Sequence, residues 1–165
     1  MQNTLYVVVP CYNEQEVLPE TARRLRDKLQ YLMNRGRISR KSRILFVNDG
    51  SRDGTWEIIE RLHIGNHLFS GLNLSRNRGH QNALLAGLMY AKDRADMAIS
   101  MDADLQDDLH AVDEMVDKYL AGVDIAYRAP SRRERDPFFK RTTPRAFDRL
   151  INALGAEPVF NACYH

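Results

Sequence analysis

The chain has 165 residues, a net charge of only +2 and 44% hydrophobic residues, enough to fill one core. We therefore predict a single domain over 1–165, with no nucleic-acid partner. Two cysteines, Cys11 and Cys163, lack CxxC spacing and are typical of reduced thiols in a cytosolic protein. The sequence shows no signal peptide before its first apolar run and no stretch of the ~20 apolar residues that cross a bilayer.

Strands and helices are expected to alternate along the chain. Apolar and β-branched runs predict strands at 5–9 (stopped by Pro10), 43–47, 72–74, 97–101 and 123–127. Helical spacing of apolar residues predicts helices at 16–33, 55–62, 81–91 and 111–120. This order predicts an α/β fold with a mostly parallel sheet and helices on both faces.

The fourth expected strand runs directly into a cluster of aspartates. Residues i and i+2 of a strand point the same way, so Asp102 and Asp104 can present their carboxylates to one point. Clustered carboxylates repel unless a cation lies between them, and Mg²⁺ or Mn²⁺ commonly combines one or two carboxylates with substrate phosphates. Taken alone, the pattern also suits a strand that ends in a polar loop.

Polar side chains follow each of the first three expected strands as well. They lie at 10–14, 48–51 and 75–80, and ligands of open α/β sheets bind at the carboxyl ends of the strands. Each segment has a local alternative: Pro10 stops a strand, Asn13 caps a helix, and Asp49 begins an ordinary turn. Because all four segments share one rim, a common site is the stronger interpretation.

Together these segments resemble the family-2 glycosyltransferases of the GT-A fold. The matching stretches are Val8–Glu14, Val47–Thr55 and Asp102–Asp107, and Leu74–Ala83 resembles the polyprenyl-phosphate branch, which includes dolichol-phosphate mannose synthases and bacterial undecaprenyl-phosphate glucosyltransferases. The resemblance implies a cell-envelope hexosyltransferase that moves a sugar, with inversion, from UDP-glucose or GDP-mannose to a polyprenyl phosphate. His80 and Gln81 favour UDP-glucose.

The resemblance also implies roles for individual residues. A metal, Mg²⁺ or Mn²⁺, would be held by Asp102 and Asp104, and the reaction would depend on Asp104, Gln106 and Asp107. Nucleotide-sugar contacts would come from Pro10, Tyr12, Asn13, Glu14, Asn48, Asp49, Arg76 and Asp102. A ring can stack on Tyr12, and carboxylates accept hydrogen bonds from base or ribose.

A basic stretch near the end of the chain suits an acceptor phosphate. From Arg128 to Arg149 there are eight basic and three acidic residues, with Phe138 and Phe139 between them. In this family context Arg132, Arg133 and Lys140 are expected to bind a lipid phosphate at the cytoplasmic face of the membrane. The alternative is a solvent-exposed charged segment with one aromatic side chain packed into the core.

The last residues depart from the family pattern. Tyr127–Pro130 replaces a Tyr-Gly-Val-Arg stretch, and Asn161–His165 replaces an Asn-His-Ala-Asp-like one. We therefore expect a chain truncated at its C-terminus, with a nucleotide-sugar half at 1–108 and an incomplete acceptor half at 109–165. A non-catalytic nucleotide-sugar-binding remnant or partner subunit stays open. A nucleotidyltransferase is disfavoured, because no glycine-rich basic phosphate loop follows the first strand.

Overall fold

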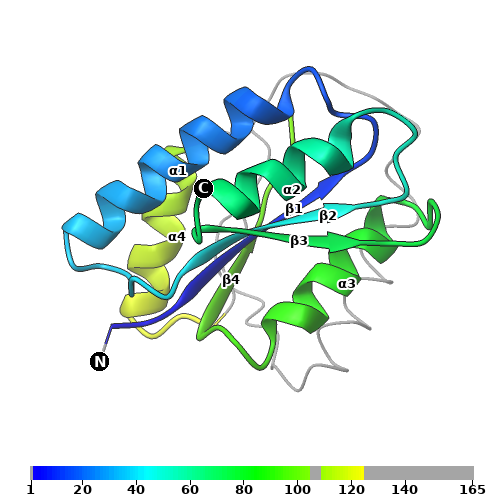
Figure 1. The fold of residues 1–165 in the computed structure, drawn as a ribbon. Helices are drawn as coiled ribbons and strands as arrows, with labels where there is room; N and C mark the ends of the chain where they lie inside the picture. The colour runs from blue at the N-terminus through cyan, green and yellow to red at the C-terminus, as the bar shows by residue number, and fades with distance from the viewer. Residues whose placement is uncertain (1, 105–108, 125–165) are drawn as a thin grey trace, which may run out of the picture. The chain divides into compact units, whose positions relative to one another are not determined.

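The computed structural model describes residues 2–104 and 109–124, and the expected alternation of strands and helices is confirmed there (Figure 1). The elements, in chain order, are β1 Leu5–Cys11, α1 Leu18–Asn34, β2 Arg43–Asn48, α2 Thr55–Gly65, β3 Phe69–Asn73, α3 His80–Ala91, β4 Met97–Ser100 and α4 His110–Leu120. Within the described ranges no helix is long and apolar enough to span a membrane.

The four described strands form one parallel sheet in the order β3-β2-β1-β4. From β1 the chain steps to β2 and β3 on one side, and then returns to place β4 on the other side of β1. This reversal of strand order lies between β1 and β4. In open α/β sheets the crevice beside such a reversal, at the carboxyl ends of the strands, is where ligands bind.

Helices cover both faces of the sheet, as the sequence predicts. α1 and α2 lie on one face and α3 lies on the other (Figure 1). The α3 face buries a cluster that joins the strands to the helix: Tyr6, Val8, Leu45, Val47, Ala83, Leu84 and Ala91. Alternate strand residues, including Val7, Val9, Ile44 and Phe46, are fully buried as well. Burial of both sheet faces explains why β1 and β2 read as continuous apolar runs.

All four described strands differ from their predicted ranges: β2 ends one residue later and β4 one residue earlier, while β1 and β3 differ by more. β3 is Phe69–Asn73 rather than 72–74, because Phe69 already pairs with Ile44 of β2. β1 continues through Pro10 to Cys11. Pro10 has no N–H to donate. The pairing of β1 with β4 ends at Val8, two residues before Pro10, whereas the pairing with β2 continues to Cys11. The strand therefore loses no bond at Pro10.

The chain divides into two compact units, Met1–Asp113 and Glu114–His165. The sheet and helices α1 to α3 belong to the first unit. Of the second unit the structure describes only residues 114–124, so the expected strand 123–127 lies largely outside the described residues, and 123–124 are not in a strand. The single domain over 1–165, with halves at 1–108 and 109–165, stays a prediction.

Two helical glycines make a matched test of the packing between α3 and the sheet. A Cβ on Gly87 would overlap the side chain of Val8 and approach Val47 at 2.8 Å, whereas a Cβ on Gly65 would meet nothing within 4 Å. Gly87→Ala is therefore expected to lower the free energy of unfolding by about 1–3 kcal/mol. Gly65→Ala should leave it unchanged or raise it by up to about 1 kcal/mol. Urea unfolding of both variants measures this, and equal stabilities would contradict the close packing.

Candidate functional site

The loops that follow β1 and β2 are tied together by hydrogen bonds. Asn13 adopts a left-handed backbone (φ 56°), donates its N–H to Ser51 Oγ at 2.9 Å, and accepts from the Arg52 N–H through Oδ1 at 2.9 Å. The Glu14 N–H donates to Thr55 Oγ1 at 2.9 Å. Gln15 completes the link, because its side-chain oxygen accepts from the Gly54 N–H and its own N–H donates to the Asp53 carboxylate.

The loop after β3 is attached to the same structure through Asp49. This carboxylate is 2% exposed and accepts hydrogen bonds from the backbone N–H groups of Arg78 at 2.7 Å and Gly79 at 2.9 Å. The adjacent Gly50 has φ +65°, and a Cβ there would lie 2.5 Å from the backbone of Arg76 and Asn77. The β2–α2 and β3–α3 loops therefore touch backbone to backbone, and only glycine permits that approach.

The loop after β4 carries the aspartates. Burial alternates along it: Met101 and Ala103 are buried, while Asp102 and Asp104 are exposed. Both carboxylates are therefore exposed, and their convergence on one point stays a prediction. Thr21 of α1 holds the loop by donating its hydroxyl to the Ala103 carbonyl at 2.5 Å, and His80 Nε2 lies 3.7 Å from Asp102 Oδ1.

The side chains of these loops influence one another electrostatically. Burial, with added repulsion from Asp104, Asp53 and Asp102, raises the pKa of the Glu14 carboxyl. The β1, β2 and β4 loops therefore concentrate negative charge at one end of the sheet. Burial, with a smaller effect of Glu14, raises the pKa of the Cys11 thiol, which stays protonated and donates to the Val9 carbonyl at 3.3 Å.

The structure separates the predicted nucleotide contacts into two groups. Tyr12 is 41% exposed and Arg76 is exposed, so both side chains are accessible to a ligand. Asn48 and Asp49 are each 2% exposed and engaged within the chain; Asn48 Nδ2 donates to Asn73 Oδ1 at 2.8 Å. Asn48, Asp49 and Asn13 fix the loops, and direct contact with a nucleotide stays a prediction for them.

Several predicted positions cannot be placed. Gln106 and Asp107, and the expected phosphate-binding residues Arg132, Arg133 and Lys140, lie outside the described residues. Conversely, sequence reasoning assigned no role to Thr21, Thr55 and Gln15, which form hydrogen bonds with residues 38 to 82 positions away. No local pattern marks such residues, because only the folded sheet brings the loops together.

A divalent metal is compatible with this end of the sheet, though the described residues form no closed cage for one. No group of three or more His, Cys, Asp or Glu side chains in the described ranges is arranged to hold an ion. Two carboxylates, Asp102 and Asp104, are exposed on one loop, and burial together with their negative charge raises the pKa of the Glu14 carboxyl. A site of this kind suits an ion that takes its other ligands from water and a diphosphate.

Comparison with known proteins settles the family. The family model described as "Glycosyl transferase family 2" matches residues 6–165, nearly the whole chain. This chain belongs to glycosyltransferase family 2. The family expected from the motifs at the strand ends is thereby confirmed.

Curated relatives extend this family assignment. An "Uncharacterized glycosyltransferase YkoT" of Bacillus subtilis is 47% identical over 160 residues, which cover 97% of this chain and 48% of the relative. A "Bactoprenol glucosyl transferase" of Shigella phage SfV is 33% identical, with coverage of 93% and 47%. The chain thus spans about half the length of the curated relatives it matches, and the polyprenyl-phosphate branch is represented among them.

Solved structures confirm the GT-A fold. A mannosyltransferase, PcManGT from Pyrobaculum calidifontis, in complex with GDP-Man and Mn²⁺, aligns with a TM-score of 0.51 at 22% identity, over 63% of this chain and 28% of that one. TarS of S. aureus in complex with UDP-GlcNAc aligns with a TM-score of 0.51 at 19% identity, over 71% and 32%. At these identities the likeness concerns the fold alone.

Proposed function

We propose that this chain binds a nucleotide-activated hexose at the carboxyl ends of β1 to β4, and that the protein transfers the hexose, with inversion, to a polyprenyl phosphate. The observation that carries the proposal is the convergence of four loops on this edge. Three of them are locked to one another by Asn13, Gln15 and Asp49, and the fourth presents Asp102 and Asp104. The edge adjoins the reversal of strand order.

Each accessible side chain has a role suited to one part of the donor. The half-exposed ring of Tyr12 offers a surface for stacking a base. The exposed Arg76 offers a guanidinium for the diphosphate, which arginine can bind through two parallel hydrogen bonds. Glu14 is partly buried and near enough to Asp104 and Asp102 to feel their charge, and its carboxylate can accept hydrogen bonds from ribose hydroxyls.

Asp102 and Asp104 are the residues that would hold Mg²⁺ or Mn²⁺. Such an ion would offset the negative charge that accumulates on the departing nucleoside diphosphate. The chain's own contribution is to keep both carboxylates exposed on a loop that Thr21 fastens to α1. Preorganised carboxylates need little rearrangement when the donor arrives.

The polyprenyl-phosphate acceptor is supported by the bactoprenol glucosyl transferase relatives. A phosphate monoester has a second pKa near 6 and is largely dianionic at neutral pH, so it is a nucleophile without a strong general base. A protein with this acceptor works at a membrane surface, in contact with its cytoplasmic face. We assign Arg132, Arg133 and Lys140 to the acceptor phosphate, and Gln106 and Asp107 to the neighbourhood of the transferred sugar.

Calorimetric titration tests the donor step. We expect the chain to bind UDP-glucose or GDP-mannose more tightly in Mn²⁺ than in chelator, and nucleoside triphosphates no more tightly than the sugar nucleotides. Tight binding of triphosphates alone would favour a nucleotidyltransferase and contradict the proposal. A radiolabelled-sugar assay with undecaprenyl phosphate then separates a transferase from a protein that only binds the donor.

A further inference from the structure

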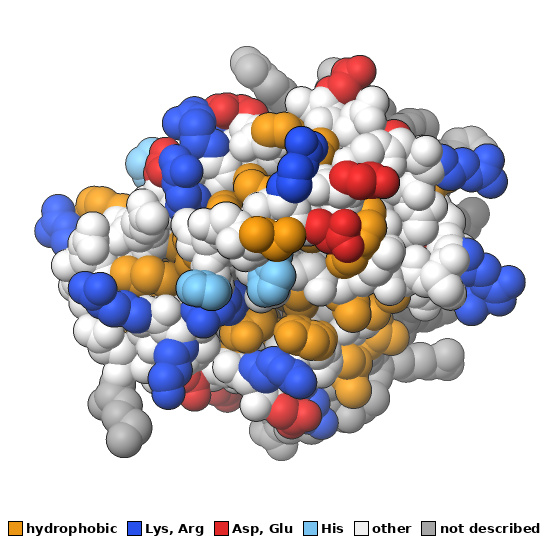
Figure 2. All heavy atoms as spheres, viewed as in Figure 1, with side chains coloured by type: hydrophobic (Ala, Val, Ile, Leu, Met, Phe, Trp, Pro, Cys, Tyr) orange, Lys and Arg blue, Asp and Glu red, His pale blue; other side chains and the backbone are white. Residues whose placement is uncertain are grey.

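A concentration of positive charge lies at the amino ends of the strands, opposite the candidate donor site. The segment 35–43, which joins α1 to β2, contains five basic residues and no acidic one: Arg35, Arg37, Arg40, Lys41 and Arg43. Arg43 is the first residue of β2, so this segment lies at the amino ends of the strands. Figure 2 shows Lys and Arg side chains along the left of the view, the side where Figure 1 places the amino ends of β2 and β3.

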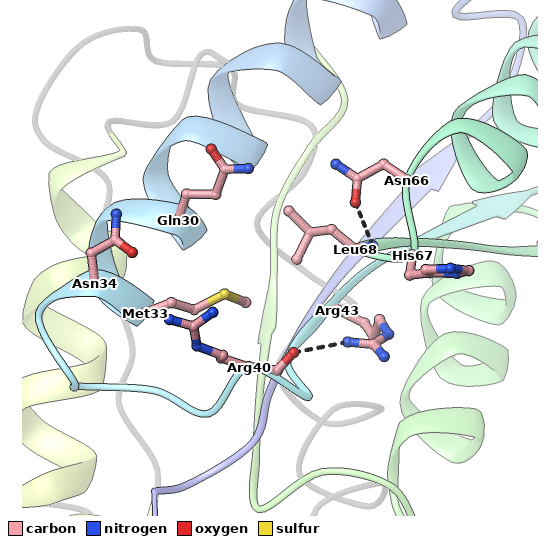
Figure 3. Close-up of a pocket in the computed structure, with 8 residues that line it drawn as sticks. All are labelled: Gln30, Met33, Asn34, Arg40, Arg43, Asn66, His67 and Leu68. Atoms are coloured by element: carbon pink, nitrogen blue, oxygen red, sulfur yellow. Dashed lines mark hydrogen bonds between the residues drawn. The ribbon is translucent and has the colours of Figure 1, made fainter.

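A hollow of about 400 Å³ opens beside this segment, a volume within the range of small-molecule sites. Figure 3 shows its lining side chains, which come from α1, the basic segment and the turn before β3: Gln30, Met33, Asn34, Arg40, Arg43, Asn66, His67 and Leu68. Among these described residues none is acidic. The hollow therefore combines two guanidinium groups, an imidazole and three amides with a small apolar floor.

The cationic side chains that line the hollow have N–H groups left to bind a ligand. Arg43 uses Nη1 for the carbonyls of Ser42 at 2.8 Å and Arg40 at 3.3 Å, which fixes its side chain and leaves its other nitrogens for a ligand. For Arg40 and His67, the described part of the chain offers no side-chain hydrogen bond or ion pair. Asn66 Oδ1 accepts from the Leu68 N–H at 2.9 Å, so its amide NH₂ stays available as a donor.

We infer that this hollow is a phosphate-binding site, separate from the donor site at the carboxyl edge. A planar guanidinium group binds phosphate through paired hydrogen bonds. Arg40, in the loop, presents its guanidinium on the Met33 side of the hollow, and Arg43, the first residue of β2, presents its own on the His67 side (Figure 3). The described lining residues include no carboxylate that would compete with a phosphate. The ligand class is a phosphate group with a short apolar portion, which Met33 and Leu68 can cover. A soluble phosphorylated compound and a lipid headgroup both present this chemistry.

The test uses amide chemical shifts of the full 165-residue chain during titration with inorganic pyrophosphate, in chelator and at constant ionic strength. We expect saturable shifts at 40–43 and 66–68. A parallel arm uses vesicles of phosphatidylglycerol or phosphatidylcholine. Saturable shifts with pyrophosphate would identify a soluble phosphorylated ligand. Shifts at the same amides with phosphatidylglycerol vesicles, but not with pyrophosphate, would identify a lipid headgroup. Either result supports the site.

Two neighbouring residues make matched variants. Arg40→Gln removes a charge that lines the hollow, whereas Lys41→Gln removes the same charge from an exposed neighbour that does not line it. Arg40→Gln should weaken binding about tenfold, the size of one lost charge-assisted hydrogen bond, and Lys41→Gln should change it less than twofold. Equal weakening by both variants, shifts confined to 76–80, or no saturable shifts would overturn the inference.

Discussion

Replacing Gly50 by alanine is expected to damage both stability and donor binding. The new Cβ would lie 2.5 Å from the backbone of Arg76 and Asn77, at a position where φ is +65°. The left-handed backbone costs about 1–2 kcal/mol for a residue with a side chain, and the overlap adds about 1–3 kcal/mol. Because the β3–α3 loop must move away, the Asp49 bonds to Arg78 and Gly79 should break, and donor affinity should fall.

Gly36 provides the matched control for this variant. Its φ is +69°, but a Cβ there would approach only the end of the flexible Gln2 side chain, at 3.3 Å. Gly36→Ala should therefore show the backbone cost alone, about 1–2 kcal/mol, with donor binding intact. Urea unfolding and calorimetric titration of both variants measure the difference. If the two variants behave alike, the loops do not depend on this close approach.

The second prediction concerns the metal. Asp104→Asn should weaken Mn²⁺-dependent binding of a nucleotide sugar by about 1–3 kcal/mol, the scale of a lost interaction with a charged group. In chelator the variant should bind at least as tightly as the natural chain, because the variant no longer turns an unneutralised carboxylate toward the diphosphate. Asp93→Asn, which removes an exposed carboxylate beyond the end of α3, should leave binding unchanged.

Titration of all three proteins against UDP-glucose and GDP-mannose, in Mn²⁺ and in chelator, decides the point. Equal affinity of the natural chain in the two conditions would falsify metal dependence. Equal loss in Asp104→Asn and Asp93→Asn would show that net charge, and no specific carboxylate, governs binding. Unfolding curves for the variants separate either effect from a loss of structure.

The sequence by itself determined the alternation of strands and helices and the family. β1 and β2 are recognisable because strands buried on both faces must be continuously apolar. The two-residue repeat of extended chain predicts that Asp102 and Asp104 lie on one side, and the structure shows both exposed beyond the end of β4. These properties depend on neighbours in the chain, so local patterns reveal them.

Only the tertiary structure showed which polar residues fasten the loops to one another. Asp49 looks like a nucleotide contact in the sequence, yet its buried carboxylate holds the backbone of Arg78 and Gly79, about 30 residues away. The start of β3 at Phe69 is likewise set by pairing with Ile44. The hollow that joins Arg40 to His67 exists because β2 and β3 lie side by side. Contacts between distant segments form only when the sheet assembles, and no local sequence pattern records them.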